Sequence, residues 1–70
     1  METLYVVEPG AYLRKDGDTL SIVKDKSVIS TIPAKGLQKI ILSGYVSLTG
    51  SVIDFCIRNR IETVFITPTG

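Results

Sequence analysis

Histidine and tryptophan are absent from this 70-residue sequence, and cysteine occurs once, at Cys56. Without histidine, the chain lacks the side chain that most often serves as a general base or as a metal ligand. A nucleophilic cysteine or serine therefore has no histidine to activate it. A single cysteine cannot form an internal disulfide, so the cysteine count does not indicate a secreted protein.

A large excess of charge of either sign is also lacking. Eight basic and seven acidic residues leave a net charge of +1, which is too balanced to indicate nucleic acid or an acidic substrate by itself. No apolar run approaches the ~20 residues of a membrane span, and no signal-peptide pattern opens the chain. We therefore expect a cytoplasmic protein, or a part of one, with no membrane partner.

Hydrophobic residues are plentiful, at 44% of the chain, which is enough for the core of one small domain covering residues 1–70. Short runs of strand-forming residues are separated by turn residues. The expected strands are Thr3–Val7, Ala11–Lys15, Thr19–Lys24, Ser27–Ile32, Lys39–Ser43, Tyr45–Leu48 and Glu62–Thr67. Tight turns are expected at Asp16-Gly17 and, without a glycine, at Asp25-Lys26. The pattern predicts a mostly β (α+β) domain: two small packed sheets of short antiparallel hairpins with one amphipathic helix.

The helix is predicted at about Ser51–Asn59, with Thr49 or Ser51 as its N-cap. Helical spacing defines its buried stripe, which comprises Val52, Ile53, Cys56 and Ile57. On this stripe Cys56 is expected to be a small buried hydrophobe. No glycine follows the helix to ease the chain reversal, and we expect Asn59 to adopt the left-handed conformation instead.

The seven acidic residues are scattered, and only Asp16 and Asp18 lie close together, on either side of a turn glycine. Two carboxylates there would hold a cation weakly, and we expect solvated turn residues rather than a metal site. Gly44 and Gly50 do not form a phosphate-binding loop. The residues alone therefore indicate no catalytic residue and no metal ligand.

Four basic residues on the predicted hairpins are candidates for contacts to DNA phosphates: Arg14, Lys15, Lys24 and Lys26. The alternative is that they are solvated and protect the edges of the sheets, where lysine is common. The interleaved acidic residues argue against strong DNA binding by this chain alone.

The order of the segments resembles that of a known family. Leu4-Tyr-Val-Val-Glu-Pro-Gly10, Tyr12–Leu20 and Ile32-Pro33 are similar to its opening hairpins and the end of its third strand. They are followed by a strand, Gly44-Tyr-Val-Ser-Leu-Thr49, a helix, a strand and Gly70. This order resembles the N-terminal β domain of the CRISPR-associated integrase/endonuclease, the metal-dependent nuclease of spacer acquisition. The family usually has glycine where Arg60 stands.

The resemblance covers essentially all of this chain but only the first part of the family's usual length. It implies that the metal-binding acids and histidine lie in a C-terminal helical domain that has no counterpart here. The parent protein would be a DNA endonuclease and integrase of antiviral defence that uses Mg²⁺ or Mn²⁺. The present chain would bind no cofactor and catalyse nothing. Gly70 falls where the family's β domain hands over to the helical domain, so we expect a truncation.

Two functions remain open. In the first, which the resemblance implies, the domain is a dimerisation scaffold: a two-fold homodimer positions two catalytic domains on one DNA, together with other spacer-acquisition proteins. Tyr45, Val46 and Leu48 are the candidate dimer interface, with core packing as the alternative. In the second, the domain is an independent nucleic-acid-binding β module that uses the basic hairpins.

Overall fold

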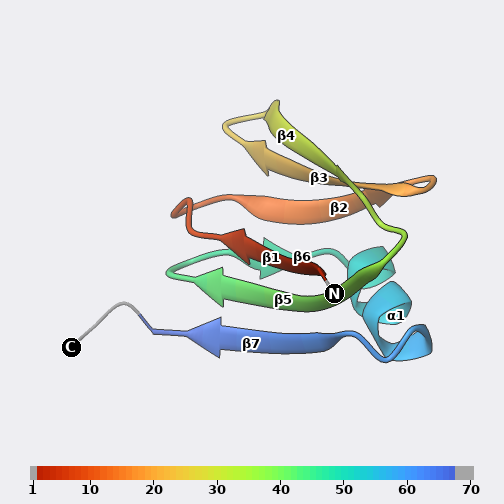
Figure 1. Ribbon diagram of the computed structural model, residues 1–70. Coiled ribbons are helices and arrows are strands. Elements are labelled where there is room, and N and C mark those ends of the chain that lie inside the picture. The colour runs from red at the N-terminus through yellow and green to blue at the C-terminus, as the bar shows by residue number, and fades with distance from the viewer. Residues whose placement is uncertain (1, 68–70) are drawn as a thin grey trace.

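Two small sheets and one helix make up the computed structural model, which describes residues 2–67 (Figure 1). The elements are β1 (Glu2–Val6), β2 (Tyr12–Asp16), β3 (Thr19–Lys24), β4 (Ser27–Pro33), β5 (Leu37–Ser43), β6 (Ser47–Leu48), α1 (Gly50–Arg58) and β7 (Glu62–Ile66). The predicted mostly β fold with two sheets and one helix is confirmed. Several boundaries differ from the sequence prediction by one or two residues, and β6 is only two residues long.

The four-stranded sheet has the order β4-β3-β2-β6, and its first three strands form two antiparallel hairpins. Gly17 provides a positive φ of 59° in the first turn. In the second turn Asp25 and Lys26 have φ values of 52° and 66° without help from a glycine. Both predicted turns are therefore confirmed, and the second uses the conformation that matches the twist of a hairpin.

The three-stranded sheet has the order β1-β5-β7, and both of its strand pairs are parallel. The chain makes the hairpins of the other sheet between β1 and β5, and it makes β6 and α1 between β5 and β7. Such long connections return the chain to the same end of the sheet, so that successive strands run in the same direction. The sequence analysis, which expected antiparallel hairpins, did not predict this parallel sheet.

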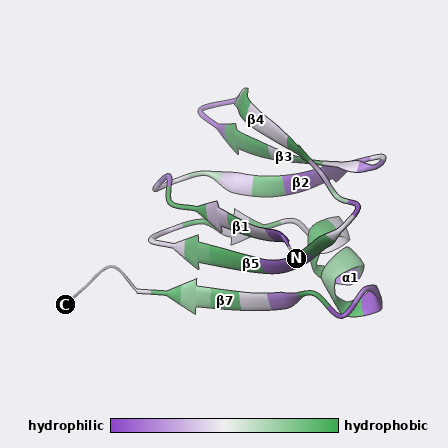
Figure 2. Ribbon diagram, in the orientation of Figure 1, coloured by the Kyte–Doolittle hydropathy of each residue, from purple (hydrophilic) through white to green (hydrophobic). Residues whose placement is uncertain are grey.

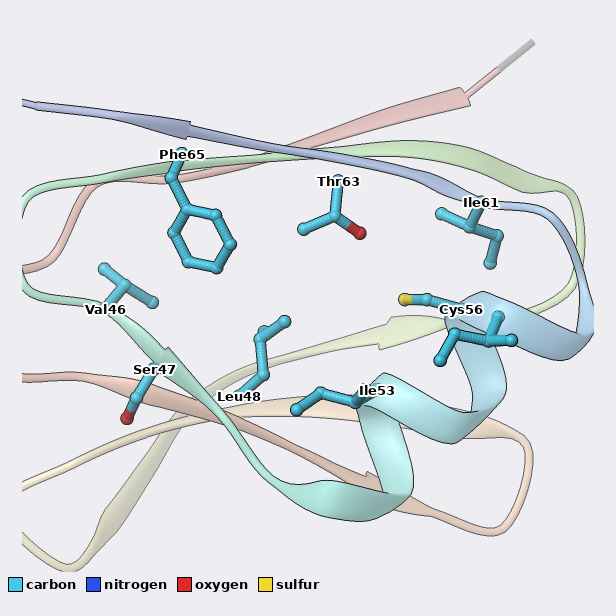
Figure 3. Close-up of a pocket in the computed structure, with 9 residues that line it drawn as sticks. Val46, Ser47, Leu48, Ile53, Cys56, Ile61, Thr63 and Phe65 are labelled. Carbon is cyan, nitrogen blue, oxygen red and sulfur yellow. The ribbon is translucent and has the colours of Figure 1, made fainter.

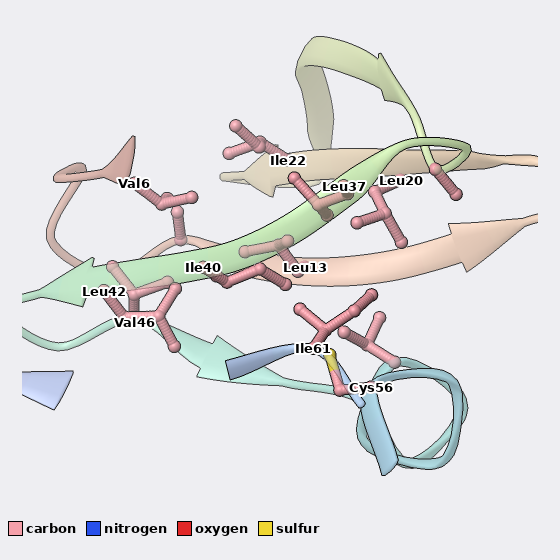
Figure 4. Packing of buried hydrophobic residues seen from close by; sticks show 13 residues of the cluster. Val6, Leu13, Leu20, Ile22, Leu37, Ile40, Leu42, Val46, Cys56 and Ile61 are labelled. Atoms are coloured by element: carbon pink, nitrogen blue, oxygen red, sulfur yellow. The ribbon is translucent and has the colours of Figure 1, made fainter. Parts of the chain in front are cut away.

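The core lies between the two sheets, and α1 closes one end of it (Figures 1 and 4). Its largest fully buried side chains come from both sheets and the helix, and they are Leu13, Leu20, Ile40, Leu42, Val6 and Val52. Strand alternation explains the pattern in β5, where Ile40 and Leu42 face inward and Ile41 between them is half-buried.

The helix buries a narrower stripe than predicted. Val52 and Cys56 are buried, as expected, but Ile53 is 46% exposed and Ile57 is 73% exposed. The prediction that these two isoleucines are buried is wrong. Because α1 has only nine residues and sits at the end of the core, it buries Val52 and Cys56 fully and packs Phe55 partly against the core, on the side of the helix away from Ile53 and Ile57.

Both ends of α1 differ in detail from the prediction. Thr49 is the N-cap residue, but its side chain makes no capping bond and instead lies 3.2 Å from the Ser51 hydroxyl. At the other end Asn59 has φ −103°, whereas Arg60 has φ 54°. The N–H of Arg60 donates to the carbonyl of Ile57, and the N–H of Ile61 donates to the carbonyl of Cys56. This is a Schellman motif with arginine at the position that glycine usually takes, so the assignment of Asn59 was wrong.

The last strand, β7, lies at the edge of the parallel sheet and is not the buried strand that its sequence suggests (Figures 1 and 2). Its side chains are half-buried or exposed throughout. Across residues 2–67, no helix has the length and apolar character needed to cross a membrane.

Candidate functional site: an apolar groove beside β7

An open groove of about 540 Å³ runs between β6, α1 and β7 (Figure 3). Its lining carries no charged side chain and consists of Val46, Ser47, Leu48, Ile53, Cys56, Ile57, Ile61, Thr63 and Phe65. The Phe65 ring points from β7 into the groove toward Val46 and Leu48, and the Cys56 side chain lies at the helix end (Figure 3).

The groove exists because the parallel sheet extends, at β7, beyond the edge of the four-stranded sheet that covers its inner face. Phe65 is the register partner of Leu42, so both side chains point to the inner face of this sheet. Leu42 is only 1% exposed, whereas Phe65, one strand further out, is 63% exposed. Opposite β7 the other sheet ends in β6, which has two residues. The inner face of β7 is therefore left uncovered.

The two exposed isoleucines of α1 give the groove its second wall. Ile53 and Ile57 are one turn apart and face the open side, where Leu48 is half-buried. A continuous apolar surface of this kind on a small domain is typical of a site that contacts protein, membrane or an apolar ligand. The groove has no acid, base or metal ligand apart from the Cys56 thiol, so its chemistry is that of hydrophobic association.

The three candidate interface residues lie in different environments. Tyr45 is 82% exposed, Val46 is buried in the core cluster, and Leu48 is half-buried. Val46 and Leu48 also line the groove, whereas Tyr45 lies in the loop just before β6. The structure thus places two of the three at the groove, and both alternatives for Val46, core packing and surface contact, have a structural basis.

Three of the four candidate DNA-contact residues are engaged within the domain. Arg14 Nε lies 2.8 Å from Asp16 Oδ2, and Lys24 Nζ lies 3.2 Å from Glu8 Oε2. Lys15 Nζ donates to the Gly17 carbonyl at 2.6 Å and lies 5.4 Å from the centre of the Phe55 ring. Lys26 is exposed in the turn after β3. Of the four, Arg14 and Lys24 are therefore paired with carboxylates.

The two acidic turn residues have separate roles. Asp16 Oδ2 accepts hydrogen bonds from Arg14 and from the Ser21 hydroxyl. Both bonds lower the pKa of Asp16 below its ordinary value, and the bond from Arg14 has the larger effect. The backbone carbonyl of Asp18 accepts a hydrogen bond from the N–H of Ala34. Within residues 2–67, no three His, Cys, Asp or Glu side chains are grouped closely enough to hold a metal ion. Asp16 therefore organises the hairpin locally.

Sequence reasoning missed Ile53 and Ile57 as surface residues, since it placed both on the buried stripe of the helix, and it did not single out Phe65. The run Val64, Phe65 and Ile66 is apolar on both faces of β7. Such a run is typical of a strand in a parallel sheet that is covered on both faces. It therefore indicates the parallel sheet, but it does not indicate the exposure of Phe65.

Comparison with known proteins gives a consistent family. The family model described as "CRISPR associated protein Cas1" matches residues 4–70. The Cas4/Cas1 fusion of Geobacter sulfurreducens, named as an exonuclease and endonuclease, is 31% identical over 96% of this chain and 12% of its own length. The CRISPR-associated endonuclease Cas1 1 of Chlorobaculum tepidum is 30% identical over 100% of this chain and 20% of its own length. The chain thus spans a fifth or less of these two relatives.

Solved structures agree on the fold. A chain of a partial Cas6-RT-Cas1–Cas2 complex superposes with a TM-score of 0.79 at 20% identity, covering 99% of this chain and 21% of that one. At this level of identity the match establishes a common fold.

Proposed function

Because the chain belongs to the family of CRISPR-associated protein Cas1, we propose that it is the N-terminal β domain of a metal-dependent DNA endonuclease/integrase and acts as its dimerisation scaffold. The single observation that carries the proposal is the apolar groove beside β7, which suits contact with other polypeptide and offers no catalytic group. In this proposal the metal-binding residues and the reaction belong to a helical domain elsewhere in the longer protein.

The proposal extends to partners. A relative of the same fold is described in a complex that contains Cas2, and the named relatives are endonucleases. We propose that the longer protein acts on DNA with other spacer-acquisition proteins and that this domain holds two copies together. The ion pairs of Arg14 with Asp16 and of Lys24 with Glu8 leave less of their charge for DNA phosphates, which favours assembly over the alternative of an independent DNA-binding module.

Self-association is the direct test. We expect concentration-dependent dimers of the 70-residue chain in sedimentation equilibrium, and we expect Tyr45→Ser to weaken them about ten-fold or more, since tyrosine is enriched among the few interface residues whose truncation costs about 2 kcal/mol or more. Tyr45 is almost fully exposed, so this change spares the core. Val46 is unsuitable for this test of the interface, because its substitution would also disrupt the core.

The matched control is Tyr5→Ser, which removes another exposed tyrosine, from the outer face of the parallel sheet. Equal dissociation constants for the two variants would remove Tyr45 from the interface. A strict monomer at the highest concentration would reject the scaffold function for this chain and would favour the DNA-contact alternative, which a salt-dependent DNA titration would then measure.

We also expect the 70-residue chain to lack nuclease activity with Mg²⁺ or Mn²⁺. Such reactions need metal ligands that converge on one point, and the Asp16 carboxylate is already engaged by Arg14 and Ser21. Purified protein should leave linear and branched DNA intact in either metal. Cleavage that persists through repurification and disappears in an Asp16→Ala/Asp18→Ala variant would contradict this expectation.

A further inference from the structure

A second open cavity, of about 630 Å³, lies beside the last turn of α1, and we call it the end pocket. Its floor is apolar and consists of Ala34, Leu37 and Ile61, which all belong to the core cluster. The half-buried Phe55, on the side of α1 away from the groove, adds an aromatic ring to the lining. Sites for small molecules occupy about 300–1,000 Å³ and have a mainly apolar lining. The end pocket therefore has the size and the base of a small-molecule site.

Backbone hydrogen bonds hold the loops around the end pocket in place. The N–H of Ala34, which follows β4, donates to the carbonyl of Asp18 in the turn between β2 and β3, at 2.8 Å. The N–H of Leu37 donates to the carbonyl of Ala34, and Gly36 between them has the positive φ, 86°, that a type II turn requires. Because the loops are tied together, the pocket is formed without a ligand, which lowers the cost of binding one.

Two lysines at the end pocket carry charge that no carboxylate neutralises. Within residues 2–67, the basic residues that form ion pairs with carboxylates are Arg14, Lys24, Lys39 and Arg58. Lys15 and Lys35, which line the end pocket, are not among them. The pocket is also lined by the acidic residue Asp18, so its lining carries two positive charges and one negative charge. This balance favours an anion.

The ammonium group of Lys15 is held at the end pocket by two uncharged partners. Its Nζ donates to the carbonyl of Gly17 at 2.6 Å and lies 5.4 Å from the centre of the Phe55 ring. An ammonium group has three N–H donors, so donors remain for a ligand. A lysine that is already positioned loses less side-chain entropy when it binds an anion than a mobile one does. Lys15 therefore places a positioned positive charge beside an aromatic ring.

We propose that the end pocket binds a small aromatic anion, namely one planar ring system that carries a phosphate or a carboxylate group. The ring would lie over the apolar floor beside Phe55, and the anionic group would accept hydrogen bonds from Lys15 and Lys35. The side-chain amides of Gln38 and Asn59 also line the pocket and would bind polar groups on the ring. The proposal goes beyond the scaffold function, because neither self-association nor DNA cleavage needs a small-molecule site.

Titrations of the 70-residue chain, followed by the backbone amide signals in proton–nitrogen NMR spectra, test the proposal. Phenyl phosphate is the minimal probe, and we expect a dissociation constant in the millimolar range, as for a ligand of about ten non-hydrogen atoms. The largest shifts are expected at Leu37, Phe55 and Ile61. Inorganic phosphate should bind about ten-fold more weakly, because it lacks the ring that covers the apolar floor.

AMP and benzoate distinguish the two sources of the anionic group. Tighter binding of AMP at the end pocket would assign a nucleotide as the ligand, and tighter binding of benzoate would assign an aromatic carboxylate. Either result supports the proposal.

Lys35→Gln is the main variant, because Lys35 is exposed in a turn and its replacement spares the core. Its matched control is Lys26→Gln, which removes the same charge from another exposed turn that does not line the end pocket. We expect Lys35→Gln and Lys15→Gln each to weaken phenyl phosphate binding about two- to five-fold, the range for a solvent-exposed charge pair. Lys26→Gln should leave the dissociation constant unchanged.

Four results would overturn the proposal. Phenyl phosphate could leave the amides of the end pocket unshifted, or it could shift only those of the groove, such as Leu48 and Ile53. Inorganic phosphate could bind as tightly as phenyl phosphate, which would exclude a role for the ring. Lys26→Gln could weaken binding as much as Lys35→Gln, which would show attraction by net charge alone. Duplex DNA could shift the same amides at lower concentrations than every small anion, which would favour the DNA-contact alternative.

Discussion

Replacement of Leu13 by alanine is expected to remove about half of the domain's free energy of unfolding. Leu13 is fully buried between the two sheets, and a Leu→Ala change at such a site costs about 2–5 kcal/mol from lost burial and the cavity that remains. At roughly 0.05–0.15 kcal/mol per residue, a 70-residue domain has only about 4–10 kcal/mol of stability in total. Urea unfolding followed by circular dichroism measures the loss.

Ile57→Ala is the matched control for Leu13→Ala, because it removes comparable apolar volume from an exposed site on the helix. We expect a change within about 0.5 kcal/mol when the protein is dilute and monomeric. A loss of 2 kcal/mol or more in this variant would place Ile57 in the core, as its spacing in the sequence suggests. An unchanged urea midpoint in Leu13→Ala would contradict the packing of the two sheets.

Replacement of Arg60 by glycine is expected to stabilise the domain. A non-glycine residue in the left-handed region costs about 1–2 kcal/mol, and glycine removes this cost while losing about 0.5–1 kcal/mol of chain entropy on folding. The expected net gain is about 0.5–1 kcal/mol. For a domain of this size, 1 kcal/mol corresponds to about 4–8 °C in melting temperature, which a calorimetric or circular-dichroism melt resolves.

Arg58→Gly, two residues earlier in the chain, is expected to lower the stability that Arg60→Gly raises. Arg58 lies within α1 and pairs with Asp54 at 2.9 Å, so glycine there should lower stability by about 1 kcal/mol through its poor helix propensity. Both variants remove one positive charge, so net charge cannot explain a difference in sign. A lower melting temperature for Arg60→Gly would mean that the Arg60 side chain contributes more than its backbone conformation costs.

Much of this protein follows from local sequence. The sequence predicted both hairpin turns, the position of most strands and the existence of one helix. Each of these depends on a few neighbouring residues, such as Gly17 in the first turn or the alternating side chains of the hairpin strands. The burial of Cys56 followed from its helical spacing to Val52. The family resemblance, which rests on the order of these local elements, was also confirmed.

What the sequence by itself did not determine depends on contacts between distant segments. Whether Ile57 is buried is decided by how far the four-stranded sheet reaches past α1, and β6 stops after two residues. The parallel pairing of β1, β5 and β7 arises because the chain crosses to the other sheet between them, and no single strand encodes that path. Arg60, rather than Asn59, takes the left-handed position because the Schellman hydrogen bonds bring Ile61 back onto the core. Local chemistry sets the elements, whereas burial and pairing are properties of the packed whole.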